Sequence, residues 1–441
     1  MSNPPSVSKA APESSTPEDS RVDTWQRYVP AQRYGMLSVL FLIGTSSYLD
    51  RSIIAVLLEP IKHEFNVSDT MLGLLSGLSF ALLYATLGIP VARLSEWWDR
   101  RKILAIAVLL WSAMTALCGI AQSFGQLLVA RFGVGAGESG TVPPAHSLIT
   151  DYFPRSQRAT ALAVFSASGV VGTVLGFIIG AQLTESYGWR VALIAVGLPG
   201  ALLALLAYVF LDEPRKSRSE GSPTEQLETT GEAFRVLLGK RSYVLLVGGM
   251  VAFFMLSFGS LAFAPAYLVR VMEVDLRTVG NIYGTVAAFG SLPGIILGGV
   301  LSDRFSKADK RWLFWTASLG MFITFPVFLL CFSAPSFTLF IALSAVGAAV
   351  LNTCVPPMYA ALHEVCGSPR RSTAVALLFF FANLLGMGLG PVIAGALSDA
   401  FTATYGTEGL RYAIITSFAF AIPASWCLYR GGILMSNDIE P

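Results

Sequence analysis

The stretch Tyr48-Leu49-Asp50-Arg51 places an acid and a base side by side in an otherwise apolar segment that runs from about residue 33 to 58. Ionisable groups at membrane depth cost on the order of 3 kcal/mol each, even on the lenient insertion scale. A second apolar segment, at about 126–151, carries Arg131 and Glu138. We place no other Asp, Glu, Lys or Arg well inside hydrocarbon, so we interpret these four side chains as one site.

The composition is that of an integral membrane protein. Hydrophobic residues make up 54% of the 441 residues and charged residues only 13%, whereas a soluble domain has about 25% charged residues. Apolar runs of roughly 20 residues can cross hydrocarbon as helices. We find twelve, at about 33–58, 70–94, 102–122, 125–151, 156–182, 188–211, 243–270, 276–302, 311–333, 336–363, 371–399 and 410–434.

The distribution of basic residues predicts the orientation in the membrane. The loops that follow even-numbered runs hold eighteen Lys and Arg residues, whereas the opposite loops hold five: Lys62, Arg190, Arg270, Arg277 and Arg411. Because cytoplasmic loops carry the excess of basic residues, we expect both termini in the cytoplasm and the protein in a bacterial inner membrane. The net charge of +2 gives no reason to expect a nucleic-acid partner.

The sequence predicts neither an enzyme nor a metal or cofactor site. The five cysteines, Cys118, Cys331, Cys354, Cys366 and Cys427, lie in or beside predicted helices, so no disulfide framework follows. No glycine-rich phosphate loop of the Walker type and no Cys/His metal spacing is present. ATP hydrolysis is therefore unsupported.

The chain divides into five parts. We expect a disordered cytoplasmic tail at 1–32, a six-helix bundle at 33–211, a cytoplasmic linker with an interfacial helix at 212–242, a second six-helix bundle at 243–435, and a short tail at 436–441. A short interfacial helix around Trp25 is the alternative for the first tail. The two bundles are an internal repeat, as in many secondary transporters.

Two related loops support the repeat. Gly88–Lys102 follows the second run, and Gly299–Arg311 follows the eighth. With six plus six helices, these loops resemble those of the major facilitator superfamily, which implies an all-α membrane fold of two six-helix bundles related by pseudo-two-fold symmetry. The resemblance also implies an inner gate, formed here by Arg93, Glu96, Arg100, Arg101, Asp303 and Arg304. The first loop departs from the pattern, notably at Trp97 and Asp99, and basic loops that only set topology are the alternative.

Within the superfamily the first half resembles the bacterial branch of the spinster family, whose animal relatives move sphingosine-1-phosphate and lysophospholipids. The matching stretches are Tyr48–Arg51, Leu58–Lys62, Leu72–Gly77, Gly88–Arg93, Ala130–Gly140, Pro143–Leu148 and Asp151–Pro154. Tyr-Leu-Asp-Arg alone discriminates less, because proton-coupled organic-anion symporters of the superfamily carry a similar stretch. The resemblance implies that the four charged side chains face a central cavity.

Depth along the helices predicts how the four charges pair. At about 1.5 Å rise per residue, Asp50 lies level with Arg131, which leaves Glu138 for Arg51. A carboxylate whose arginine moves away takes up a proton more easily, so we expect Asp50 and Glu138 to carry protons, with Arg51 and Arg131 as counter-ions and head-group ligands. A static salt-bridge network between the helices is the alternative.

The second bundle lacks matching charges. We expect the substrate cavity to have one ionic wall and one apolar wall, with contributions from Ser47, Phe254, Phe258, Asn352, Met358 and Tyr359. Such a cavity suits an amphiphile, so we expect a monomeric, proton-linked transporter of an amphiphilic lipid. The alternatives are a proton symporter of a small organic anion such as a sugar acid, and a membrane receptor or scaffold that transports nothing.

Overall fold

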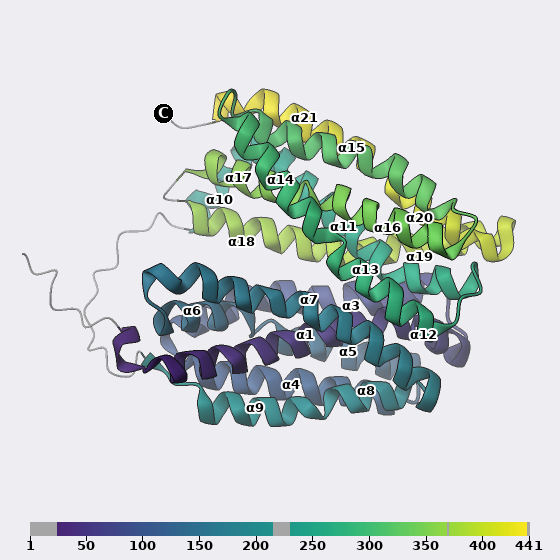
Figure 1. The fold of residues 1–441 in the computed structure, drawn as a ribbon, viewed down its shortest axis with the longest axis horizontal. Helices are drawn as coiled ribbons and strands as arrows, with labels where there is room; N and C mark the ends of the chain where they lie inside the picture. The colour runs from purple at the N-terminus through teal and green to yellow at the C-terminus, as the bar shows by residue number, and fades with distance from the viewer. Residues whose placement is uncertain (1–23, 215–229, 368–369, 439–441) are drawn as a thin grey trace, which may run out of the picture.

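The computed structural model describes residues 24–214, 230–367 and 370–438, and every regular element in these ranges is a helix. Figure 1 shows two bundles lying side by side, with α1 to α9 in one and α11 to α21 in the other. The predicted all-α membrane fold of two bundles is confirmed. We call the end where α1 begins and α10 lies the linker end, and the opposite end, where α1 finishes, the far end.

The N-terminal bundle crosses the membrane region six times. Its first and fifth spans, the long helices α1 and α7, pack against each other. The spans are α1 (Pro30–Phe65), α2 (Asp69–Gly73) with η3 (Leu74–Leu78) and α3 (Ser79–Trp97), α4 (Arg100–Ile120), α5 (Phe124–Glu138) with α6 (Val142–Tyr152), α7 (Arg155–Tyr187), and α8 (Trp189–Gly197) with α9 (Pro199–Phe210).

The C-terminal bundle repeats this order after the linker helix α10 (Thr230–Gly239). Its spans are α11 (Arg241–Arg270), α12 (Leu276–Thr278) with η5 (Val279–Tyr283), α13 (Gly284–Phe289) and α14 (Ser291–Ser306), α15 (Trp312–Phe332), α16 (Phe337–Asn352) with α17 (Val355–Cys366), α18 (Arg371–Phe381) with η6 (Ala382–Met387) and α19 (Gly388–Tyr405), and η7 (Gly406–Glu408) with α20 (Gly409–Ala419) and α21 (Ala421–Asp438).

Ten stretches of the described chain are long and apolar enough to cross a membrane. The last of them, Arg371–Ser436, holds two consecutive spans, and the fourth predicted span, which is divided into α5 and α6, is not among the ten. The division follows from Val142-Pro143-Pro144, and Val355-Pro356-Pro357 divides the tenth span in the same way. Proline donates no backbone hydrogen bond, yet it fits the first turn of a new helix.

The two bundles approach each other most closely in the far half of the molecule. There η3 and α2 pack on α19, and α7 packs on α12, η5 and α13. A Cβ on Gly77 would lie 2.4 Å from the carbonyl oxygen of Gly388, and one on Gly280 would lie 2.6 Å from that of Phe177. Only glycine fits at these crossings. Both η3 and η5 are π-helical turns, a rare form that is frequent at functional sites.

The boundary of the predicted N-terminal tail at residue 32 is wrong. Residues 24–27 form the 3-10 helix η2, α1 starts at Pro30, and residues 1–23 lie outside the described chain. The Tyr28 hydroxyl donates to Asp212 over 2.8 Å, and burial together with this hydrogen bond raises the pKa of Tyr28 above its usual range. The segment is ordered because it packs on the end of the bundle.

Candidate functional site

Asp50 and Arg131 form the first predicted ion pair. Arg131 Nη1 lies 3.4 Å from Asp50 Oδ2, and both side chains are 2% exposed. Thr115 on α4, which the sequence did not single out, donates its hydroxyl to the same oxygen over 2.9 Å. Asp50 Oδ1 and Arg131 Nε are buried without a hydrogen-bond partner. This long, single contact leaves the pair incompletely satisfied.

Glu138 and Arg51 form the second predicted pair, and it is tighter. Arg51 Nε donates to Glu138 Oε2 over 2.6 Å, and the Ser47 hydroxyl donates to the same oxygen over 2.7 Å. Glu138 is fully buried, and its Oε1 lacks a partner. Ser47 is therefore buried against the carboxylate and does not line the cavity itself.

Aromatic rings surround both guanidinium groups. The Arg51 guanidinium carbon lies 4.5 Å from the ring centre of Tyr84, 4.8 Å from that of Phe80 and 5.3 Å from that of Tyr48. The Arg131 guanidinium lies 5.2 Å from Phe80. Cations are attracted to the faces of such rings, more strongly where water is excluded. Tyr84 and Phe80 look like ordinary membrane-helix residues in the sequence, which gives no signal for this contact.

A cavity of about 160 Å³ lies between the two bundles beside these charges. Its polar wall belongs to the N-terminal bundle and includes Arg51 and Arg131. The C-terminal bundle contributes only apolar residues, which are Phe258, Leu261, Ala262, Met387 and Pro391. The expected contrast between an ionic wall and an apolar wall is present.

The other residues expected in the C-terminal wall are not among those that line this cavity. Phe254 packs on Phe258 with ring centres 5.7 Å apart. Asn352 and Tyr359 are half-buried, and Asn352 donates to the carbonyl of Ala348. Met358 is fully buried, so its predicted place on the cavity surface is wrong. It is buried because α17 packs against α11, α14 and α15 within its own bundle.

The residues expected at the inner gate lie at the linker end on both bundles. Arg93 and Glu96 at the end of α3 are exposed, as are Asp303 and Arg304 at the end of α14. Arg101 is half-buried, with its guanidinium 5.0 Å from the ring centre of Tyr208.

Arg100 differs from the rest of the expected gate because it is fully buried. Its Nη2 pairs with Asp151 at 2.7 Å and with Glu213 at 2.5 Å, and its Nη1 donates to Ser147. All these partners belong to the N-terminal bundle or to the residues that directly follow it. In this structure Arg100 therefore fastens the start of the linker to the bundle.

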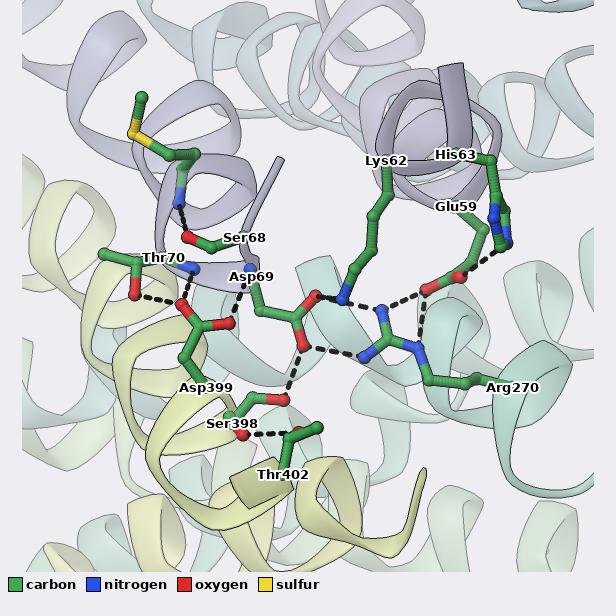
Figure 2. A network of polar contacts seen from close by, with 11 residues as sticks. Glu59, Lys62, His63, Ser68, Asp69, Thr70, Arg270, Ser398, Asp399 and Thr402 are labelled. Carbon is green, nitrogen blue, oxygen red and sulfur yellow. Dashed lines mark hydrogen bonds and ion pairs between the residues drawn. The ribbon is translucent and has the colours of Figure 1, made fainter. Parts of the chain in front are cut away.

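A second charged network, which the sequence reasoning missed, joins the two bundles at the far end (Figure 2). Arg270, the last residue of α11, donates to both oxygens of Asp69 over 2.6 and 2.9 Å and also binds Glu59 of α1. Asp69 further accepts from Lys62 and from Ser398, each at 2.6 Å. Arg270 is 14% exposed and Asp69 1%. The network is therefore largely sealed from solvent.

Asp399 on α19 completes this network by capping α2. Its carboxylate accepts from the backbone N–H groups of Asp69 and Thr70 over 2.8 and 2.9 Å. A carboxylate is favoured at a helix N-terminus, where N–H groups lack partners. The sequence held one signal, because Leu397-Ser398-Asp399 repeats the Leu301-Ser302-Asp303 of the expected inner gate. We missed it because charges at the end of a span look like ordinary loop charges.

No group of three or more His, Cys, Asp or Glu side chains within the described residues is arranged to hold a metal ion. The arrangement that remains consists of two buried ion pairs beside a cavity, at the interface of two similar bundles. A family model described as Major Facilitator Superfamily matches residues 40–307 and 277–432. The chain belongs to the major facilitator superfamily.

Relatives of this superfamily member fall into more than one transport class. An MFS-type efflux pump of Mycolicibacterium smegmatis is 31% identical over 95% of this chain and 96% of that protein. Protein spinster homolog 1 of Xenopus laevis is 29% identical over 82% of this chain and 72% of that protein. A probable L-galactonate transporter of Escherichia coli is 24% identical over 90% and 89%.

A solved structure with a similar fold is that of a bacterial homolog of the human lysosomal transporter spinster, in an inward-facing and unoccupied conformation. It has a TM-score of 0.85 and 29% identity, and the match covers 94% of this chain and 100% of the other. The predicted resemblance to the superfamily and to its spinster branch is confirmed. This major facilitator protein is a multi-pass membrane transporter, with its bundles locked together at the far end.

Proposed function

We propose that this transporter moves an amphiphilic lipid of the sphingoid or lysophospholipid type across the membrane, linked to protons and by alternating access. The observation that carries the proposal is the contrast across the cavity, between Arg51 and Arg131 on one wall and apolar side chains around Phe258 on the other. The spinster relatives support a transporter of the spinster type, and the lipid class is what the sequence resemblance to that family implies.

The two walls suit the two ends of such a lipid. An arginine binds a phosphate or carboxylate head through two parallel hydrogen bonds. An acyl tail against Phe258, Leu261 and Met387 gains about 0.8 kcal/mol for each buried methylene. Arg131 is the more weakly paired of the two arginines, since its contact with Asp50 is long, whereas Arg51 is the more exposed.

Asp50 and Glu138 carry the protons in this proposal, with Arg51 and Arg131 as their counter-ions. Each carboxylate is buried and keeps one oxygen without a partner. When an arginine turns to a substrate anion or shifts during rocking, the carboxylate that it leaves favours its protonated form, because a lone buried charge is costly. Substrate and proton then occupy the site together.

The orientation follows from the basic loops. With the linker end and both termini in the cytoplasm of a bacterial inner membrane, the Arg270 network closes the outer side. The structure is then the inward-facing state of a monomer, in which the gate residues Arg93, Glu96, Asp303 and Arg304 are exposed. The similar spinster structure, described as inward-facing, supports this assignment.

A proton symporter of a small organic anion is the second candidate. The galactonate-transporter relative favours it, as does the Tyr48–Arg51 stretch. Such an anion would use the arginines and leave the apolar wall unused.

The deciding experiment is a binding and uptake series in liposomes made with purified protein. Lysophosphatidic acids that differ only in tail length are compared with galactonate under an imposed pH gradient. We expect affinity to rise with each methylene. A flat dependence on tail length, combined with saturable proton-driven uptake of galactonate, would instead establish the organic-anion symporter.

A further inference from the structure

We propose that Phe80 is a positioning residue that holds Arg51 and Arg131 next to each other in the cavity wall, independently of which carboxylate is protonated. The ring is 2% exposed. Its centre lies 4.8 Å from the Arg51 guanidinium and 5.2 Å from that of Arg131. For the transport readout this inference rests on the proposed function, whereas its structural readout does not.

A ring that contacts both guanidinium groups, at 4.8 and 5.2 Å from its centre, offsets the repulsion between them. Two guanidinium groups so close together repel each other, and each is held by only one carboxylate, Glu138 for Arg51 and Asp50 for Arg131. When a carboxylate takes up a proton, its arginine loses that ion pair. The electron-rich faces of an aromatic ring attract cations whatever the state of the acids, so Phe80 continues to hold both arginines.

The position of the ring is itself fixed. Phe80 stacks on Tyr84 with ring centres 5.2 Å apart and planes 22° from parallel. Its backbone touches α5, where a Cβ on Gly135 would lie 2.3 Å from the Phe80 carbonyl oxygen. Since α5 also carries Arg131 and Glu138, the ring is fixed relative to these two charges.

Two substitutions at Phe80 separate the effect of the aromatic face from the effect of side-chain size. Phe80→Met removes the aromatic face but keeps an unbranched apolar side chain, whereas Phe80→Trp keeps an aromatic face. We expect Phe80→Met to raise the KM for a long-tail lysophosphatidic acid about tenfold with a smaller change in kcat, as loss of a desolvated cation–π contact implies. Phe80→Trp should remain close to wild type in KM. Phe165→Met, at a buried aromatic of the same bundle that packs beside His146, is the control and should change neither parameter.

A second measurement needs no substrate. Thermal unfolding midpoints in detergent are compared for Phe80→Met, Arg131→Lys and the double variant. If Phe80 holds Arg131, the two shifts are not additive, since residues that interact directly couple in such a cycle. Additive shifts, together with a KM for Phe80→Met equal to that of Phe80→Trp, would overturn the proposal. A wild-type protein that moves no lysophosphatidic acid would refute the lipid function, while the cycle still decides the role of Phe80.

Discussion

The carboxylate of Asp399 caps α2 by binding Thr70, the second residue of that helix, although the two residues are 329 positions apart in the chain. It accepts from the Thr70 backbone N–H over 2.9 Å and from the Thr70 hydroxyl over 2.5 Å. Because α2 and α19 belong to different bundles, these bonds exist only while the far end is closed. The Asp399 hydrogen bonds and the Arg270 ion pairs therefore hold the far end closed, and they must break for it to open.

Replacing Arg270 by alanine should shift the transporter toward its outward-open state. Loss of this arginine leaves Asp69 and Glu59 poorly compensated, and breaking a buried pair costs on the order of 3–5 kcal/mol. The measurement is the labelling rate, by an impermeant thiol reagent added from outside, of a single cysteine placed at Ala262 in the cavity wall. We expect faster labelling.

Arg277→Ala is the matched control for this experiment. Arg277 also bridges the bundles at the far end, through Glu185 at 2.7 Å, but its side chain is 52% exposed. Exposed pairs contribute little, so labelling should stay near the wild-type rate. Equal labelling rates for the Arg270 and Arg277 variants would show that the buried network is not the lock.

The repeated Leu-Ser-Asp sequence predicts the contact that closes the linker end in the opposite state. Asp303 occupies the same position in the Leu301–Asp303 sequence as Asp399 does in Leu397–Asp399. Ser156 is the second residue of α7, just as Thr70 is the second residue of α2. Both Asp303 and Ser156 are exposed here. We expect Asp303 to cap α7 in the outward-facing state.

Cysteines placed at Asp303 and Ser156 in a cysteine-free background test this contact. The pair should form a disulfide that arrests transport, and adding Arg270→Ala should speed its formation. A pair at Lys307 and Ser156 serves as the control and should form more slowly. If Arg270→Ala does not change the rate of cross-linking, closure of the linker end is not coupled to opening of the far end, which would contradict this prediction.

The sequence predicted the fold and the central charges because both depend on strong, local signals. Apolar runs define membrane helices, and Asp50 or Glu138 in such a run is conspicuous because a buried charge needs a partner. The far-end network escaped prediction for the opposite reason. Arg270 and Lys62 stand at span ends, where charge is ordinary. Lys62 reaches Asp69 within the N-terminal bundle, but only the packing of the two bundles brings Arg270 to Asp69.

The sequence also did not determine which side of its helix each side chain faces in the packed bundle. Met358 was expected in the cavity, yet it is fully buried in its own bundle, because the Val355–Pro357 break restarts the helix. Thr115 and Phe80 are too common in membrane helices to be singled out, although both touch the charged groups. Their contacts follow from tertiary packing, which the sequence does not display.

Removing Arg131 alone should destabilise the protein more than removing it together with its partner. Arg131→Met leaves Asp50 as a lone buried charge, at a cost of about 3–5 kcal/mol, whereas Asp50→Asn with Arg131→Met leaves no charge behind. Thermal unfolding midpoints of the two variants check this. A double variant less stable than the single one would mean that the pair itself stabilises the bundle.

Glu138→Gln should abolish the acceleration of transport by a proton gradient while the protein remains folded. The amide is nearly isosteric with the carboxyl group, so it can still accept from Ser47 and Arg51, but it cannot exchange a proton. Asp50→Asn should act in the same direction. The test is uptake into liposomes with and without an imposed pH gradient, and unchanged pH dependence in both variants would leave a static network that only holds α1 to α5.

Phe258→Ala and Arg131→Ala should separate the two ends of the substrate. Phe258 lies on the apolar wall and Arg131 on the ionic one. Truncating Phe258 removes surface that only a tail can reach, so affinity for long-tail lysophosphatidic acids should fall by about 1–2 kcal/mol, while short-tail analogues and galactonate are nearly unaffected. Arg131→Ala should weaken every anionic ligand, because the phosphate of a lysophosphatidic acid and the carboxylate of galactonate would both bind this arginine. Binding of the tail-length series to both variants is the measurement.

If Phe258→Ala weakened short and long ligands equally, the apolar wall would have a structural role only, and the organic-anion symporter would become the better account of the cavity.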